Sequence, residues 1–130
     1  MSSIFSRIIS GEIPCHKVGE NDQFLAFLDI MPLKEGHVLV IPKKEVDYIF
    51  DMEDDLLSEM ILFAKSIAKK MKIVLPCKKI GITVIGLEVP HAHIHLIPIN
   101  SVADMDFSKQ KLKLENNQLA EIAKLISMQD

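Results

Sequence analysis

Residues 91–98 read His-Ala-His-Ile-His-Leu-Ile-Pro, and this stretch decides the interpretation of the chain. Histidine and apolar residues alternate along it, which is typical of a β-strand with one face turned to a core. In a strand, residues two apart point to the same side, about 7 Å from one to the next. The pattern therefore predicts a strand over residues 91–97, with His91, His93 and His95 in a row on one face.

The row of imidazoles indicates a functional site. One histidine in a strand is usually a hydrogen-bonded structural residue, but three in alternation place ionisable groups where apolar residues could stand. Neutral imidazole is a common zinc ligand, so a metal site is one interpretation. Imidazole is also a good nucleophile near neutral pH, because its unperturbed pKa is ~6.5, and a neighbouring ring can donate to a phosphoryl oxygen. The residues alone leave both interpretations open.

The surrounding sequence predicts an α+β domain. Apolar residues recur at the helical period over about residues 54–75, and Pro76 ends that helix. Shorter helices are expected over residues 3–10 and 116–126, with a helical turn at Tyr48, and further strands over residues 16–19, 23–29, 37–41 and 80–85. Because the strands mostly follow one another, we expect a five-stranded, mostly antiparallel sheet with helices on one face. Residues 100–114 receive no assignment.

Length and composition place limits on the class of protein. The 130 residues fit one domain, and the formal net charge of -3 argues against a sequence-independent nucleic-acid binder. Cys15 and Cys77 form no CxxC pair. No run approaches the ~18 apolar residues of a membrane span, and the first ten residues lack a targeting pattern. We expect a single domain over residues 1–130 in the cytoplasm, with no membrane or nucleic-acid partner.

The histidine motif resembles the signature of the histidine triad (HIT) superfamily, His-φ-His-φ-His-φ-φ with φ apolar. Segments at residues 4–14, 26–30 and 37–43 resemble the family in the same order and spacing. The resemblance covers about residues 3–100 and is closest to Hint-type purine nucleoside phosphoramidases and bacterial HIT proteins. Residues 101–130 would then be a C-terminal extension. It implies a HIT-like fold and a homodimer in which strands of two copies pair into one sheet.

The resemblance also implies roles for individual residues. His93 would attack the α-phosphorus of a nucleotide and carry a nucleotidyl group, while His95 would contact the phosphate or the bridging atom. His91 would fix the ring of His93, partly through its backbone carbonyl, and His37 would support the row from an adjacent strand. The implied substrate contacts are Asp29 to the ribose hydroxyls, Phe5, Phe27 and Ile30 to the base, and Glu88 and Val89 beside them. For the apolar residues, a plain core role fits equally well.

Two departures from the family pattern bear on the chemistry. Ser3, Ser6 and Glu45 stand where some bacterial relatives have cysteine and histidine ligands to structural zinc, so we expect no structural metal and no cofactor. Glu88 stands where relatives often have Ser, Thr or Gln. Its carboxylate could repel phosphate, transfer a proton, or have a structural role in its loop.

The resemblance implies a hydrolase or transferase that acts at the α-phosphate of a purine nucleotide, AMP- or GMP-like. A nucleoside phosphoramidate is the expected kind of substrate, cleaved through a nucleotidyl-histidine intermediate. A dinucleoside polyphosphate hydrolase and a catalytically weak nucleotide-binding adaptor remain alternatives.

Overall fold

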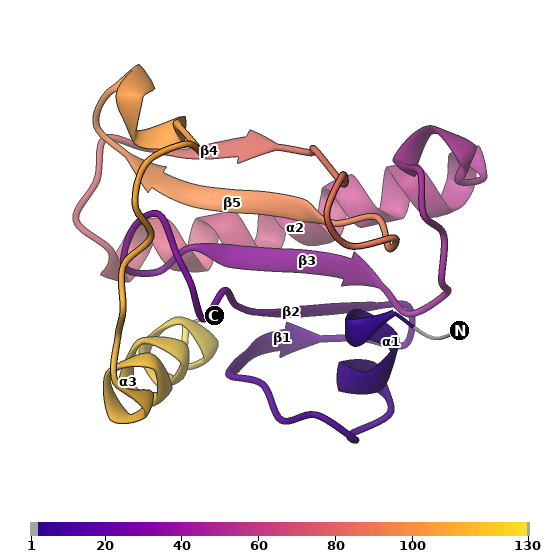
Figure 1. The fold of residues 1–130 in the computed structure, drawn as a ribbon, viewed down its shortest axis with the longest axis horizontal. Coiled ribbons are helices and arrows are strands. Elements are labelled where there is room, and N and C mark those ends of the chain that lie inside the picture. The colour runs from indigo at the N-terminus through magenta and orange to yellow at the C-terminus, as the bar shows by residue number, and fades with distance from the viewer. Residues whose placement is uncertain (1–2, 130) are drawn as a thin grey trace.

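The computed structural model describes residues 3–129 and contains one five-stranded sheet (Figure 1). Its strands are β1 (Lys17–Glu20), β2 (Phe24–Leu28), β3 (Val38–Pro42), β4 (Lys79–Thr83) and β5 (Ile94–Ile99). The spatial order is β1-β2-β3-β5-β4, and every neighbouring pair is antiparallel. The predicted fold class is confirmed.

Three α-helices and two short 3-10 helices surround the sheet. They are α1 (Ile4–Ile9), α2 (Asp54–Val74), α3 (Asn116–Ser127), η1 (Ile49–Asp51) and η2 (Val102–Met105). The long helix begins and ends within a residue of its predicted limits. Pro76 follows its last turn, where proline cannot continue the helix. Among residues 3–129, no helix has the length and apolar character needed to span a membrane.

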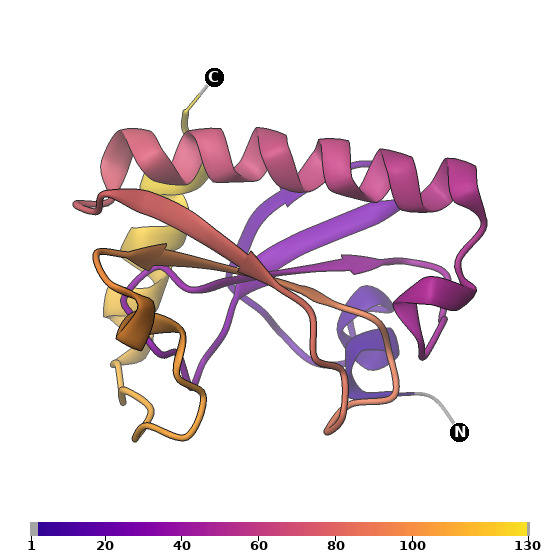
Figure 2. The same cartoon turned by 90° about the horizontal axis from the view of Figure 1, so that it is seen from above.

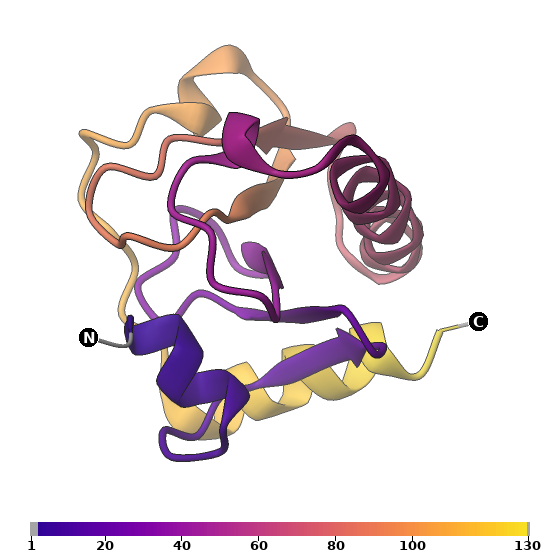
Figure 3. The ribbon, with the colours of Figure 1, turned by 90° about the vertical axis from the view of Figure 1, so that its right-hand side faces the viewer.

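The helices lie on both faces of the sheet, so the prediction that they share one face is wrong for α1. α2 runs along one face, while α1, η2 and the connection between β4 and β5 lie on the other (Figure 2). Figure 3 shows the same layering with α2 seen nearly end-on and α3 beside the β1 edge. α3 shares the α2-side core through Leu119, Ala123 and Ile126.

The central strands are apolar on both faces, which explains the position of α1. In β2, Phe24, Ala26 and Leu28 join the core under α2, whereas Leu25 and Phe27 join a second core with Phe5 of α1. All five β2 residues are buried, as predicted for this strand. A strand with two apolar faces needs cover on each, and α1 supplies part of the second.

The histidine motif enters the sheet later than predicted. β5 begins at Ile94 rather than at residue 91, because the ladder with β3 ends at the pair Val40 and Ile94. Before that point, the backbone N–H of Ala92 donates to the carbonyl of Val46 instead of to β3. His91 and His93 therefore lie in the connection that leads into the strand.

Candidate active site

His91 is anchored at both ring nitrogens. Its Nε2 lies 2.8 Å from the carbonyl oxygen of Pro42, which can only accept, so Nε2 carries the proton. Its Nδ1 lies 2.9 Å from Oγ of Ser3. With Nε2 protonated, neutral His91 accepts the Ser3 hydroxyl proton at Nδ1. The His91 side chain is wholly buried, so these two bonds fix its ring.

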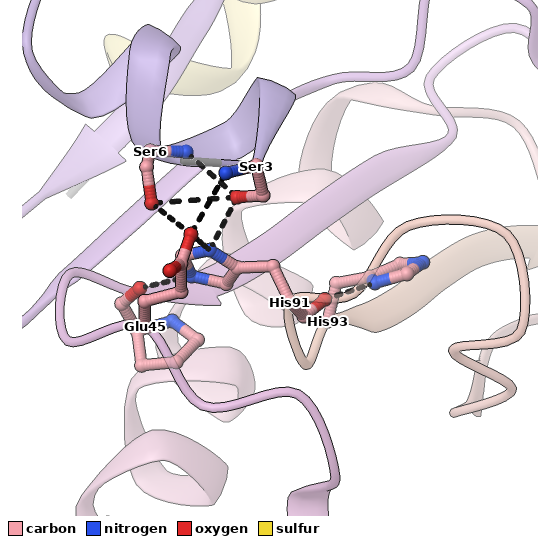
Figure 4. Close-up of polar contacts among 6 residues, drawn as sticks. Ser3, Ser6, Glu45, His91 and His93 are labelled. Carbon is pink, nitrogen blue, oxygen red and sulfur yellow. Dashed lines mark hydrogen bonds and ion pairs between the residues drawn. The ribbon is translucent and has the colours of Figure 1, made fainter. Parts of the chain in front are cut away.

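Ser3 belongs to a cluster that joins α1 to the loop after β3 (Figure 4). Oε1 of Glu45 accepts from the backbone N–H of Ser3 at 2.8 Å and from the Ser6 hydroxyl at 2.7 Å. Ser3 also caps α1, because its Oγ accepts from the backbone N–H of Ser6 at 3.0 Å. The cluster therefore ties the first helix to His91.

His93 is held through the backbone of His91. Nδ1 of His93 lies 2.8 Å from the carbonyl oxygen of His91 and must donate to it (Figure 4). In the neutral ring, the lone pair then resides on Nε2. Every fully buried side-chain nitrogen or oxygen in residues 3–129 has a hydrogen-bond partner, and Nε2 of His93 forms no bond within those residues. This atom therefore reaches the surface as an accessible lone pair.

Nε2 of His95 carries a proton, unlike Nε2 of His93, because of a second chain of hydrogen bonds. The backbone N–H of Leu33 donates to Nδ1 of His37 at 3.1 Å, so the proton of neutral His37 lies on Nε2. That Nε2 lies 3.0 Å from Nδ1 of His95 and donates to it. Neutral His95 must then carry its proton on Nε2. The resemblance implies that His37 supports the row from an adjacent strand; in the structure His37 directly precedes β3, and its ring bonds that of His95.

Burial keeps these rings neutral. It lowers the pKa of His37 to about 3, helped by the charges of His95 and Lys111. Burial and the neighbouring His93 lower the pKa of His95 to about 4. Burial also lowers the pKa of His91, although the Pro42 carbonyl and Glu45 oppose the shift. Near neutral pH, His95 is therefore a hydrogen-bond donor without a charge.

The predicted substrate-contact residues are four apolar side chains and two carboxylates, and the apolar ones differ in burial. Phe5 packs edge-on against His93 with ring centres 5.0 Å apart, and against Phe27 at 5.7 Å. Phe27 is buried beneath α1, so the structure favours its core role over contact with a base. Ile30 is 64% exposed, and Val89 packs half-buried against the same core as Phe5.

The two carboxylates near the site have different surroundings. Asp29 lies with one carboxylate oxygen 3.8 Å from Nε2 of His37 and accepts from the backbone N–H of Met31. Burial raises the pKa of Asp29, and the charge of Glu88 adds to this, while the Met31 bond and the charges of His93 and Lys111 oppose it. Glu88 is exposed. Both carboxylates thus act electrostatically on the same site.

Sequence reasoning missed several partners of the histidines. The Leu33 N–H and the Pro42 carbonyl are backbone groups, which carry no residue-type signal. Phe107 packs edge-on against His95 at 4.8 Å between ring centres and lies 6.2 Å from His37. Phe107 belongs to residues 100–114, for which the sequence predicts no helix or strand because they show neither helical nor strand periodicity.

Two groups of side chains are possible metal ligands. One ligand atom each of Asp29, His37 and His95 lies within 4.8 Å of the others. However, neutral His37 can bind a metal through Nε2 only with its proton on Nδ1, where the Leu33 N–H already donates. Two donors would then face each other, so the hydrogen-bonded arrangement is favoured.

The Ser3, Ser6, Glu45 and His91 cluster does not fit structural zinc either. Zinc in proteins prefers thiolate, imidazole and carboxylate ligands, usually four in a structural site. This cluster offers one imidazole and one carboxylate, and its two hydroxyls are engaged in hydrogen bonds. His91 in turn has both nitrogens engaged. The cluster is therefore a set of hydrogen bonds that holds α1 against His91 and Glu45.

Known proteins are similar to this chain in sequence and in fold. The HIT domain family model matches residues 10–102. An uncharacterized HIT-like protein of Borreliella burgdorferi is 37% identical, over 96% of this chain and 96% of its own. Adenosine 5′-monophosphoramidase HNT1 of Saccharomyces cerevisiae is 41% identical, over 73% of this chain and 61% of its own. A crystal structure of a Hit-like protein from Bartonella henselae matches with a TM-score of 0.85 at 32% identity, covering 97% of this chain and 94% of that one. This chain therefore belongs to the HIT domain family.

Proposed function

We propose that this protein is a nucleotide hydrolase or transferase that acts at the α-phosphate of purine nucleotides, cleaving the P–N bond of a nucleoside phosphoramidate. The observation that carries the proposal is the state of His93: Nδ1–H donates to the His91 carbonyl, and Nε2 is accessible with its lone pair. The resemblance to HNT1, an adenosine 5′-monophosphoramidase, supports this choice of substrate.

The first step uses His93 as nucleophile. Nε2 attacks the α-phosphorus and forms an N–P bond while the P–N bond to the leaving amine breaks. The departing nitrogen takes up a proton from solvent and leaves as the neutral amine. The His93 ring becomes cationic in the adduct, and its Nδ1–H bond to the His91 carbonyl, 2.8 Å long, strengthens because the donor is now charged.

His95 assists this step by donation. Its Nε2–H, fixed by the bonds from Leu33 through His37, is suited to a phosphoryl oxygen or to the bridging atom as charge develops. In the second step, water attacks the phosphorus and releases a proton to solvent, the His93–phosphorus bond breaks with its electron pair returning to Nε2, and the nucleotide leaves. Asp29, which lies beside His37, is the group we assign to the ribose hydroxyls, because a carboxylate accepts two hydrogen bonds.

The test is turnover of adenosine 5′-phosphoramidate by the wild-type protein and by His93→Ala. We expect release of AMP by wild type and a fall in kcat of at least roughly 10³-fold in the variant, as for loss of other covalent nucleophiles. Mass spectrometry after rapid denaturation should find an adenylyl group on wild type alone. His16→Ala is the matched control, because His16 precedes β1 and lies outside the histidine site.

Equal rates for wild type and His93→Ala would remove His93 from its role. Faster hydrolysis of diadenosine polyphosphates than of the phosphoramidate would identify the leaving group as a nucleotide instead. AMP binding without turnover of either substrate would indicate an adaptor.

We further propose a homodimer formed through the β4 edge and a single domain over the whole chain. β4 is the last strand of the sheet, with one side unpaired within residues 3–129. Exposed apolar side chains follow one another along and after it: Ile82, Val84, Ile85 and Leu87. An edge of this kind is suited to pairing with a second copy. The domain proposal is supported by α3, whose buried side chains share the α2-side core.

A further inference from the structure

The segment between η2 and α3 runs along the side of the sheet opposite α2 (Figures 1 and 3), and it contacts the candidate site through a side chain. The backbone N–H of Leu112 donates to the Pro32 carbonyl at 2.8 Å, which ties the segment to the loop that leads from Asp29 to His37. Phe107 packs edge-on against His95. These residues follow the part of the chain, residues 10–102, that the HIT domain model matches.

Lys111 is a cation of this segment that lies against Phe107, the residue that contacts His95. Its Nζ donates to the carbonyl oxygens of Phe107 and Lys109 and lies 5.9 Å from the centre of the Phe107 ring. The same ring lies 4.8 Å from His95 and 6.2 Å from His37, centre to centre. The side chain is half-buried. An ammonium group has three N–H donors, so two are used and one is left for a ligand.

His37 and His95 supply no positive charge to the site near neutral pH. His37 and His95 are neutral near pH 7, because burial lowers their pKa values to about 3 and about 4. Asp29 and Glu88 contribute negative charge to the same region. A nucleotide phosphate would therefore meet two carboxylates beside the uncharged rings of His37 and His95. The charge of Lys111 acts on this region: it opposes the rise that burial causes in the pKa of Asp29, and it adds to the lowering that burial causes in the pKa of His37.

We propose that Lys111 is a phosphate-binding residue of this site, whose free N–H and positive charge hold the anionic phosphoryl group beside His93 and His95. The inference rests on the proposed function and extends it with a residue outside the family-matched region. It also gives Phe107 a role: the ring and the carbonyl of Phe107 position the Lys111 ammonium. The ligand that Lys111 would bind is a nucleoside monophosphate or its phosphoramidate.

The test compares a charged ligand with a neutral one of the same base and ribose. AMP and adenosine are titrated by calorimetry into wild type, Lys111→Met, Lys111→Arg and the control Lys109→Met. Loss of a charge-assisted hydrogen bond should weaken AMP binding by about 10- to 100-fold in Lys111→Met. Adenosine binding should stay unchanged, and Lys111→Arg should retain most AMP affinity. Lys109 is exposed and lends its backbone carbonyl, which methionine keeps.

The binding results test the role of Lys111 and the proposed function separately. Equal AMP affinity in wild type and Lys111→Met overturns the role of Lys111 and leaves the proposed function intact. A parallel loss of AMP and adenosine binding also overturns it, since it shows that Lys111 only holds the segment in place. No AMP binding by wild type contradicts the proposed function itself, and the role of Lys111 with it.

Discussion

At the scale of single residues, two chains of hydrogen bonds give His93 and His95 opposite characters. One runs from Ser3 to His91 and, through the backbone of His91, to His93, and it leaves a lone pair on Nε2. The other runs from the Leu33 N–H through His37 to His95, and it leaves a proton on Nε2. A nucleophile and a donor thus lie side by side, with ring centres 4.9 Å apart. Chemically identical side chains are differentiated by their partners.

Ser3 is the positioning residue that this arrangement singles out. Ser3→Ala removes the only hydroxyl that reaches Nδ1 of His91 within residues 3–129, together with the N-cap of α1. We expect kcat to fall about tenfold with little change in KM, as for a misplacement that costs ~1.4 kcal/mol in the transition state. Thermal unfolding should show a loss of roughly 1–3 kcal/mol from the cap and the orphaned ring nitrogen.

NMR spectroscopy distinguishes a purely structural role of Ser3 from a role in positioning the His93 ring. The ¹⁵N shifts of His93 should show a mixture of tautomers in Ser3→Ala and a single one in Ser3→Thr, which keeps the hydroxyl. Ser6→Ala is the matched control, because Ser6 bonds Glu45 but not His91. An unchanged kcat and an unchanged His93 tautomer in Ser3→Ala would remove Ser3 from this role.

The residue types of the site were predictable, and their partners were not. The alternating motif identifies His91, His93 and His95, because spacing along a strand is a local property. The contact between Ser3 and His91 joins residues 88 positions apart, and no local pattern encodes it. Lys111 shows the same limit, since its charge acts on Asp29 and His37, which are far from it in the sequence.

At the scale of elements, periodic segments were predicted closely and aperiodic ones were not. α2 follows from one continuous apolar stripe, and its buried residues Met60, Ala64, Ile67 and Met71 lie on that stripe. The start of β5 was misplaced because strand pairing depends on the partner strand as well as on alternation. The backbone of Ala92 finds its partner in Val46, outside the sheet.

The edge strand β4 carries the prediction for assembly. Ile82 is 54% exposed and lies on this strand, so Ile82→Lys should place a charge in the proposed interface without opening the core. We expect wild type to sediment as a dimer and the variant as a monomer at the same concentration. Val102→Lys is the control, because Val102 is 91% exposed and belongs to η2. A wild-type protein that stays monomeric at high concentration would contradict the proposed dimer.

At the scale of the whole molecule, the buried neutral histidines make the free energy of unfolding depend on pH. The unfolded chain titrates these histidines near pH 6.5, whereas the folded pKa values of His37 and His95 are about 3 and about 4. Above pH 6.5 both states are neutral, and the histidines add no pH dependence. Below it the unfolded state takes up protons that the folded state does not. The free energy of unfolding therefore decreases as pH falls.

The window between pH 6.5 and 4.5 contains the histidine effect. Asp29, whose pKa is raised by burial, opposes it in wild type and in a histidine variant alike, so the difference between their slopes reports the histidine. The depressed carboxylates Glu20 and Glu45, with pKa values of about 2, lose their contribution only as pH falls below about 4.5, where the unfolded carboxylates take up protons. Within the window, each neutral histidine should lower stability by up to ~1.4 kcal/mol per pH unit. Urea unfolding at several pH values gives the slope for wild type and for His37→Gln, whose amide can still donate to His95 but does not titrate. The variant should show a slope shallower by about one proton, and identical slopes would mean that His37 is protonated in the folded protein.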